Sequence, residues 1–242
     1  MHFGLLSFHP ESSRQFGGVG LMVARPDVAL RVEPIRGQRC EGRGVMSDRA
    51  AAFADRFNKQ AIEAGLIDEA IAARIDVLRM PRPHCGFGTG TQLGLAVARA
   101  MSQIAGLGPM DVAELSRLVG RGLRSAIGAH GSEHGGLIVD GGKAQAERLS
   151  PMVARLEFPT HWPIVLIRPQ RLVGLSGERE RAAFAKMPPL SPAITERMCR
   201  LVLLGMLPAV MDEDIEEFGD ALYELQQLAG ECFKAEQGGI YA

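Results

Sequence analysis

The sequence has few aromatic residues and no excess of either charge. Phenylalanine, tryptophan and tyrosine make up 5% of its 242 residues, and 27 Lys and Arg side chains are balanced by 28 Asp and Glu side chains. Base-stacking surfaces need aromatic rings, and nucleic acid backbones attract an excess of positive charge. We therefore expect no nucleic acid partner.

Cysteines and long apolar runs are also scarce. The longest apolar stretch, 201–211, is interrupted by Gly205 and Pro208 and is too short to cross a membrane. The first residues lack a basic region followed by an apolar core, so no signal peptide is predicted and a cytoplasmic location is expected. Neither a zinc knuckle nor a disulfide framework is indicated, because four cysteines lie far apart without a C-x-x-C pair: Cys40, Cys85, Cys199 and Cys232.

The length allows one large domain or two small ones with a sizeable core. Hydrophobic patterning predicts strands at 3–8, 19–24, 28–32, 74–80, 137–139 and 164–167. It predicts helices at 48–64, 91–105, 111–118, 195–211 and 212–234. Interleaved strands and helices of this kind indicate an α+β fold, with two lobes at 1–160 and 161–242 that meet near Trp162.

Two of these helices carry further expectations. Asp48 should cap the first and Gly65 should end it, and Pro208 should kink or end the helix at 195–211. The apolar stripe of the first helix should consist of Ala52, Phe53, Phe57, Ala61 and Ile62.

The most informative feature is a glycine-rich run at 84–92, His-Cys-Gly-Phe-Gly-Thr-Gly-Thr-Gln, directly before an alanine-rich helix. Glycine lets a backbone approach a ligand closely, and a helix N-terminus offers unpaired N–H groups and partial positive charge. The run lacks the lysine of a P-loop and fits no register of the dinucleotide fingerprint. It predicts a phosphate or pyrophosphate site, or else a tight strand-to-helix turn without a ligand. The candidate residues are Gly86, Gly88, Thr89, Gly90, Thr91 and Gln92.

A second glycine-rich stretch covers 120–142 and contains Arg121 and Arg124. Their guanidinium groups offer forked donors that suit phosphate or carboxylate, unless both are simply solvated. Asp140 stands before Gly141 and Gly142, where a turn-capping role is the alternative to a role in chemistry.

The first glycine run resembles the second motif of the GHMP small-molecule kinase superfamily, which is followed by an alanine-rich helix. Several of those kinases also carry Ser-Gly-[Val/Ile]-Asp, with the aspartate as the base toward the acceptor hydroxyl. Residues 125–128 stand in that register, and Gly128 occupies the place of the aspartate. Glycine cannot accept a proton, which weakens the hypothesis of an ATP-dependent kinase.

A narrower resemblance, to the β-ribofuranosylaminobenzene 5'-phosphate synthases, covers essentially the whole chain. Its motifs lie at 2–6, 17–20, 90–92, 120–128, 135–142, 174–180 and 218–222. It implies a GHMP-kinase-like two-lobe fold, with a ribosomal protein S5 domain 2-like N-terminal lobe and an incomplete ferredoxin-like C-terminal lobe. Family members carry one more short strand before His2, and a segment with Gln-Ser-Ser-Trp-Gly-Pro-Thr after the point where this match ends. The chain is therefore expected to be truncated at both ends, and a homodimer or a non-catalytic remnant stays an alternative.

The resemblance implies condensation of phosphoribosyl pyrophosphate with 4-aminobenzoate or 4-hydroxybenzoate, with loss of pyrophosphate and carbon dioxide, in tetrahydromethanopterin biosynthesis. The first glycine run would hold the pyrophosphate beside Arg121 and Ser125. Asp140, Arg124 and His2 would be catalytic, with Asp140 as a ligand of Mg²⁺. Neither pyridoxal phosphate nor a nicotinamide cofactor is expected.

Other polar residues are weaker candidates. His130 and His134 have the i, i+4 spacing of metal ligands, but the glycines around them make a helix doubtful. Arg168 is either a cleft residue or a surface residue, and the surface is favoured. Glu178, Glu180 and the carboxylates of 212–217 suit the first turns of helices rather than a metal cluster.

Overall fold

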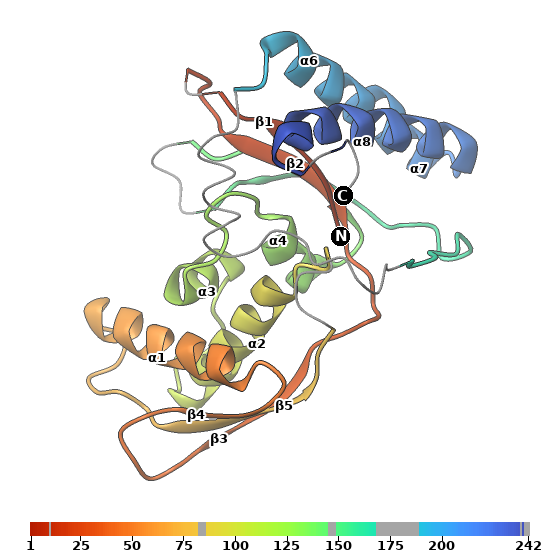
Figure 1. Cartoon of the computed structure of the whole chain (residues 1–242). Coiled ribbons are helices and arrows are strands. Elements are labelled where there is room, and N and C mark those ends of the chain that lie inside the picture. Colours follow the sequence, from red (N-terminus) through yellow and green to blue (C-terminus); the bar gives the residue numbers. More distant parts are fainter. Residues whose placement is uncertain (10, 82–85, 145–148, 168–188, 238, 240–242) are drawn as a thin grey trace.

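Two β-sheets organise the computed structural model, which describes residues 1–9, 11–81, 86–144, 149–167, 189–237 and 239 (Figure 1). The first sheet is antiparallel, in the order β1 (His2–Ser7), β2 (Phe16–Leu21), β6 (Leu137–Asp140) and β7 (Met152–Leu156). The second has the order β3 (Ala29–Pro34), β5 (Ala73–Arg79) and β4 (Glu41–Gly44), with β4 parallel to β5. The predicted α+β class is thus confirmed.

The three-stranded sheet shares a core with α1 (Ser47–Glu63), α2 (Thr89–Ile104) and α3 (Val112–Val119). Its largest fully buried side chains include Phe57, Ile75, Leu93, Met101 and Leu118. These three helices were predicted to within two residues at each end.

Two expectations for α1 are wrong in detail. The residue that caps it is Met46, in a left-handed conformation at φ +60°, and Asp48 lies in the first turn. Ala52 and Ile62 are exposed, whereas Ala50 and Ala54 are buried together with Phe53, Phe57 and Ala61. The helix rotates toward its small residues because α2 and α3 pack closely against them, a tertiary constraint that periodicity alone does not contain.

The four-stranded sheet is covered on one face by the carboxyl-terminal helices. These are α6 (Pro192–Leu201), the π-helical turn η1 (Val202–Met206), α7 (Leu207–Met211) and α8 (Ile215–Gln237). Figure 1 shows them side by side along β1. Val19 and Leu137 of the sheet share their core with Met198, Met206 and Leu225. Described helices of the predicted second lobe therefore pack on strands of the first, and the boundary at 160 stays a prediction.

Pro208 does not end its helix. The Leu207 N–H bonds to the carbonyl of Val202, five residues back, in the wider turn of η1. Because Pro208 has no N–H to donate, this wider turn lets the chain continue as helix to Met211.

Residues 164–167 are not a strand, contrary to the prediction. Within the described part of the chain they pair with no other segment, and Val165 and Ile167 are 77% and 89% exposed. A run of four apolar residues carries too little periodicity to distinguish a strand from an extended surface segment.

Candidate functional site

The first turn of α2 contains most of the predicted phosphate-binding residues. Gly88 caps the helix at φ +60°, and Gly86 has φ +77°. A Cβ atom added at either position would meet nothing within 4 Å, so the backbone conformation, not packing, calls for glycine there. The N–H groups of Thr89 and Gly90 have no carbonyl four residues earlier in the helix, which leaves them available to an anion.

Two guanidinium groups lie against this turn. Arg121 donates to Thr91 Oγ1 at 3.0 Å. A Cβ atom on Gly90 would lie 2.6 Å from Arg49 Nη2 and 3.6 Å from Arg121 Nη2, so both arginines lie over the bare backbone of Gly90. The helix N-terminus and the two cations together form an electrostatic environment suited to a phosphate or pyrophosphate.

Arg49 is a residue that sequence reasoning missed, although the chain contains a signal for it. It lies in the first turn of α1, where the helix dipole disfavours a cation. A positive charge in an unfavourable position is a reason to look for an anion nearby.

Gly94, one turn after Gly90, explains how the arginines come so close. A Cβ atom there would lie 3.1 Å from the Phe53 ring and 3.4 Å from Arg121 Cγ. The pair of glycines makes a flat strip on α2, on which Phe53 and the stem of Arg121 pack.

His2, Ser125 and Asp140 form a hydrogen-bonded chain beside this turn. Ser125 Oγ donates to Asp140 Oδ2 at 3.0 Å, and it lies 2.9 Å from His2 Nε2. Since the serine proton is used on Asp140, the network assigns the donating proton of the second contact to His2 Nε2. Three of the predicted site residues thus come together from β1, β6 and the start of α4 (Ile127–His134).

A β-bulge places His2 on the correct face of its sheet. His2 pairs with Gly20, but Gly4 pairs with Val19, so Phe3 and Gly4 together oppose one residue of β2. Phe3 packs on the core of the carboxyl-terminal helices, and His2 lies on the opposite face. Gly18 gives room to the ring, since a Cβ atom there would lie 2.9 Å from His2 Nε2.

Asp140 is buried and hydrogen-bonded to neighbouring protein groups, so it is not exposed to a substrate or a metal ion. The residue is 0% exposed, and its oxygens accept from Ser125 Oγ and from the N–H groups of Ala126 and Gly142. Burial raises the pKa of the carboxyl above its ordinary value, even though these three donors oppose the rise. Its geometry is that of a residue that orients Ser125.

This environment does not fit the predicted Mg²⁺ at Asp140. A metal ligand needs an oxygen lone pair directed at an accessible space, and those of Asp140 are directed at protein donors. In the described part of the chain no three His, Cys, Asp or Glu side chains are grouped as a metal site. The role of Mg²⁺ stays a prediction, and no chemical step is derived from it.

The pKa of His2 leads to a prediction about stability. Burial of the ring, and second to it the positive charge of the amino terminus, lower this pKa to about 4 from an ordinary 6.5, although the residue as a whole is exposed. Between pH 4 and 6.5 the unfolded chain binds a proton that the folded chain does not, so the free energy of unfolding should rise with pH across this window. The variant His2→Gln should lack this increment, as measured by urea denaturation at several pH values.

The exposed His161 supplies a control for that experiment. His161→Gln should keep the pH dependence of the unmodified protein. Because the pKa of Asp140 is raised, its contribution to the free energy of unfolding falls as pH rises on the acid side. This contribution is common to all three proteins and cancels when they are compared. Equal slopes in the unmodified protein and His2→Gln would contradict the assignment.

Gln92 and Gly128 hold α2 against α4. Gln92 Nε2 donates to the carbonyl of Gly128 at 2.8 Å, and a Cβ atom on Gly128 would lie 3.2 Å from Thr91 Cγ2. The place of the kinase aspartate is therefore packed against α2. Arg124, half-buried, precedes Ser125 in the connection between α3 and α4.

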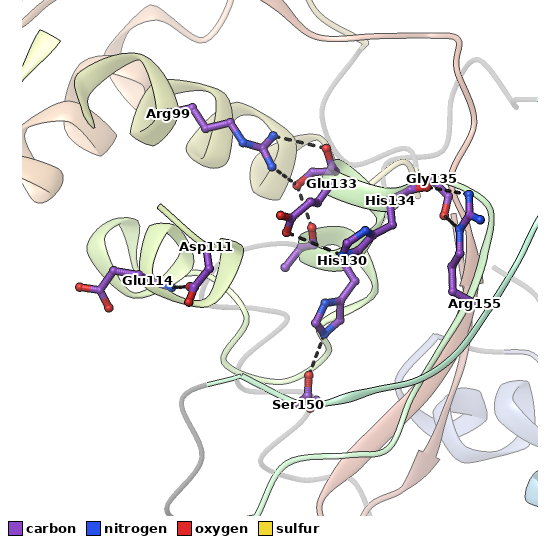
Figure 2. Close-up of polar contacts among 11 residues, drawn as sticks. Arg99, Asp111, Glu114, His130, Glu133, His134, Gly135, Ser150 and Arg155 are labelled. Carbon is purple, nitrogen blue, oxygen red and sulfur yellow. Dashed lines mark hydrogen bonds and ion pairs between the residues drawn. The ribbon is translucent and has the colours of Figure 1, made fainter. Parts of the chain in front are cut away.

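The doubt about a helix at His130 and His134 is wrong, because both lie on α4 (Figure 2). His130 Nε2 contacts the carbonyl of Ser150 at 2.8 Å, and His134 Nε2 lies 3.8 Å from Glu133. Ser132 receives hydrogen bonds from Arg99 of α2, which brace α4 from the other side. These contacts make His130 a connector between α4 and residue 150. His84, Cys85, Arg168 and 174–180 lie outside the described residues.

Sequence comparison relates this chain to characterised families. No protein-family model matches the chain. It is 35% identical to the β-ribofuranosylphenol 5'-phosphate synthase of Archaeoglobus fulgidus over 251 aligned positions, which cover 99% of this chain and 77% of that protein. The protein of the same name from Methanothermobacter thermautotrophicus is 30% identical, over 93% of this chain and 73% of its own. The chain belongs to the β-ribofuranosylphenol 5'-phosphate synthase family.

Structural comparison confirms the GHMP-kinase-like fold of this synthase family member. The L. major mevalonate kinase in complex with R-mevalonate superposes with a TM-score of 0.53 at 15% identity, over 85% of this chain and 66% of the kinase. At that identity the similarity shows the fold alone.

The synthase fold brings most of the predicted site residues into two clusters. Arg121 meets the first turn of α2, and His2 and Asp140 meet Ser125 just before α4. The contact of Gln92 with the Gly128 carbonyl joins α2 to α4 between them. None of the helices that the structure describes is long and apolar enough to cross a membrane.

Proposed function

We propose that this synthase condenses phosphoribosyl pyrophosphate with 4-hydroxybenzoate or 4-aminobenzoate, as a step of tetrahydromethanopterin biosynthesis. The observation that carries the proposal is the anion site at α2, where a helix N-terminus, Arg49 and Arg121 converge. A departing pyrophosphate is the group in this reaction that most needs such an environment.

The reaction balances without an oxidant or a net proton transfer to the protein. The ring carbon that bears the carboxylate bonds to the anomeric carbon of the ribose, whose bond to the pyrophosphate oxygen breaks. The bond between that ring carbon and the carboxylate then breaks, carbon dioxide leaves, and the electron pair restores the aromatic ring.

The chain's own residues supply binding and orientation in this scheme. Arg49, Arg121 and the N–H groups of Thr89 and Gly90 stabilise the negative charge that grows on the leaving pyrophosphate. Ser125 gives its proton to Asp140 and accepts from His2, so its part in this scheme is to fix the His2 ring. Arg124 is the candidate for binding the second anionic group of phosphoribosyl pyrophosphate, the 5'-phosphate.

The names of the relatives favour the hydroxylated substrate. Those synthases are named for a ribofuranosylphenol, which keeps a hydroxyl on the ring. If this chain acts on the same class, 4-hydroxybenzoate is the acid that would leave a phenol after decarboxylation.

An ATP-dependent kinase is the alternative that the fold allows. Its family aspartate is replaced by Gly128, and a larger residue there would have to displace Thr91, since a Cβ atom would lie 3.2 Å from Thr91 Cγ2. A non-catalytic homologue is the other alternative, and turnover decides between them.

The test is incubation of the purified chain with phosphoribosyl pyrophosphate, Mg²⁺ and carboxyl-labelled 4-hydroxybenzoate. We expect labelled carbon dioxide and pyrophosphate in equal amounts. ADP formation from ATP and a small alcohol would instead indicate a kinase. Binding of phosphoribosyl pyrophosphate without turnover of either mixture would indicate a non-catalytic homologue.

A further inference from the structure

A cavity of about 350 Å³ runs along α2 from its N-terminal turn. Thr89, Gln92, Ala96 and Arg99 line it, and their spacing of three, seven and ten residues places them on one stripe of the helix. At 1.5 Å per residue, the stripe from Thr89 to Arg99 is about 15 Å long. The cavity therefore extends from Thr89, in the first turn of α2, to Arg99.

Most other residues of the described wall are apolar. They include Met22, Val23, Ala24, Val28 and Phe87. Its volume lies near the lower end of the range of small-molecule pockets, about 300–1,000 Å³, which suits one aromatic ring.

Arg99 is the cationic side chain in the described lining of this cavity; the amino-terminal ammonium of Met1, which also lines it, donates to the carbonyl of Leu21. Its two terminal nitrogens donate to the carbonyl and to Oγ of Ser132, both at 3.3 Å, which fixes the guanidinium plane between α2 and α4. These bonds use two of its five N–H donors. The charged partner in the lining, Asp27, is engaged by Arg79 at 2.6 and 3.2 Å.

We propose that this cavity binds the ring of a para-hydroxylated aromatic acid and that Arg99 donates to the para oxygen. The inference rests on the proposed function, and it makes Arg99 the residue that determines which aromatic acid the synthase prefers. The ring carbon that bears the carboxylate then lies on the side of the N-terminal turn of α2, next to the anomeric carbon. The carboxylate itself lies against the apolar lining of the cavity.

The chemistry of the two benzoates explains the discrimination. A guanidinium stabilises a phenolate, and a phenolate oxygen releases electron density to the opposite ring carbon, where the new C–C bond forms. The nitrogen of 4-aminobenzoate is a poor acceptor because its lone pair is shared with the ring, and its N–H groups would meet the donors of Arg99. A guanidinium on the carboxylate would oppose its loss as carbon dioxide, which is why the para position is the better partner.

Arg99→Met tests the contact, because methionine keeps much of the stem and removes the donors. By calorimetry we expect affinity for 4-hydroxybenzoate to fall about 10- to 100-fold, the range for lost hydrogen bonds to a charged group. Affinity for 4-aminobenzoate and for inorganic pyrophosphate should stay within about twofold. The long-wavelength absorption of bound phenolate should disappear in this variant, and Arg39→Met, on an exposed loop, should retain it.

Ala96→Phe is a second variant that does not depend on Arg99. It fills the cavity from the α2 stripe, so both aromatic acids should lose binding while inorganic pyrophosphate still binds. Thermal unfolding confirms that each variant is folded.

Several results would overturn the inference. Equal losses for both benzoates in Arg99→Met, or no loss, would remove Arg99 from the para contact while leaving the proposed function intact if labelled carbon dioxide is still released. Tighter binding of ATP than of 4-hydroxybenzoate, abolished by Ala96→Phe, would assign the cavity to a nucleotide. If the unmodified protein binds neither inorganic pyrophosphate nor an aromatic acid, the proposed function fails together with the inference.

Discussion

Binding of phosphoribosyl pyrophosphate is expected to be abolished in Gly88→Val, while the variant still folds. The N-cap conformation at φ +60° is strained for any residue with a Cβ atom, and most for a β-branched one. Relief of that strain moves the start of α2 and turns the N–H groups of Thr89 and Gly90 away from the anion. Isothermal titration with phosphoribosyl pyrophosphate measures the loss.

Gly65→Val is a matched control for this variant. Gly65 has φ +67°, and a Cβ atom there also meets nothing within 4 Å, but the residue follows α1 at the end remote from Arg49. Each variant should lose about 1–3 kcal/mol of stability through the same backbone strain. Binding should be lost in Gly88→Val alone, and unchanged affinity in that variant would contradict a phosphate role for the turn.

The double variant Arg49→Ala, Arg121→Ala should lose affinity for inorganic pyrophosphate by about two to four orders of magnitude. The estimate takes about 1.5–3 kcal/mol for each charge-assisted contact. Both guanidinium groups lie over Gly90, so they should act on one anion. Titration at two salt concentrations should show a weaker salt dependence in the variant, because two cations are gone.

Arg36→Ala, Arg39→Ala changes the net charge equally at two exposed loop positions. It should bind pyrophosphate like the unmodified protein. A similar loss in this control would mean that overall charge, and not the position of Arg49 and Arg121, determines affinity. The single variants should lose less than the double variant, and Arg49→Ala should also loosen the packing of Phe53.

The elements that local sequence determines were predicted well. Helix α2 begins after Gly88 because glycine allows the left-handed cap, and α3 begins at Asp111, whose side chain accepts from the Glu114 N–H. The glycine run therefore identified the position of a helix N-terminus correctly. Its phosphate-binding role stays a prediction.

The features that sequence reasoning missed depend on contacts between distant segments. Arg49 reaches the site because α1 and α2 dock through Gly90 and Gly94, and no local pattern around Arg49 contains that docking. Asp140 was predicted as a catalytic residue and Mg²⁺ ligand, without the hydrogen bond to Ser125, because its burial depends on the pairing of β6 with β2 and on the N–H of Ala126. The apolar run at 164–167 predicts a strand that the structure does not contain, because composition alone does not reveal whether a partner strand exists.

The bulge in β1 separates His2 from Gly4, which regular alternation would place on the same side of the sheet. His2 faces a polar network, whereas Phe3 and Gly4 both face the apolar core. Among related chains, substitutions at the His2 position should therefore follow the chemistry of the reaction, and those at the Phe3 position the volume of the helices behind it. An alignment that gains or loses one residue here would exchange the two roles.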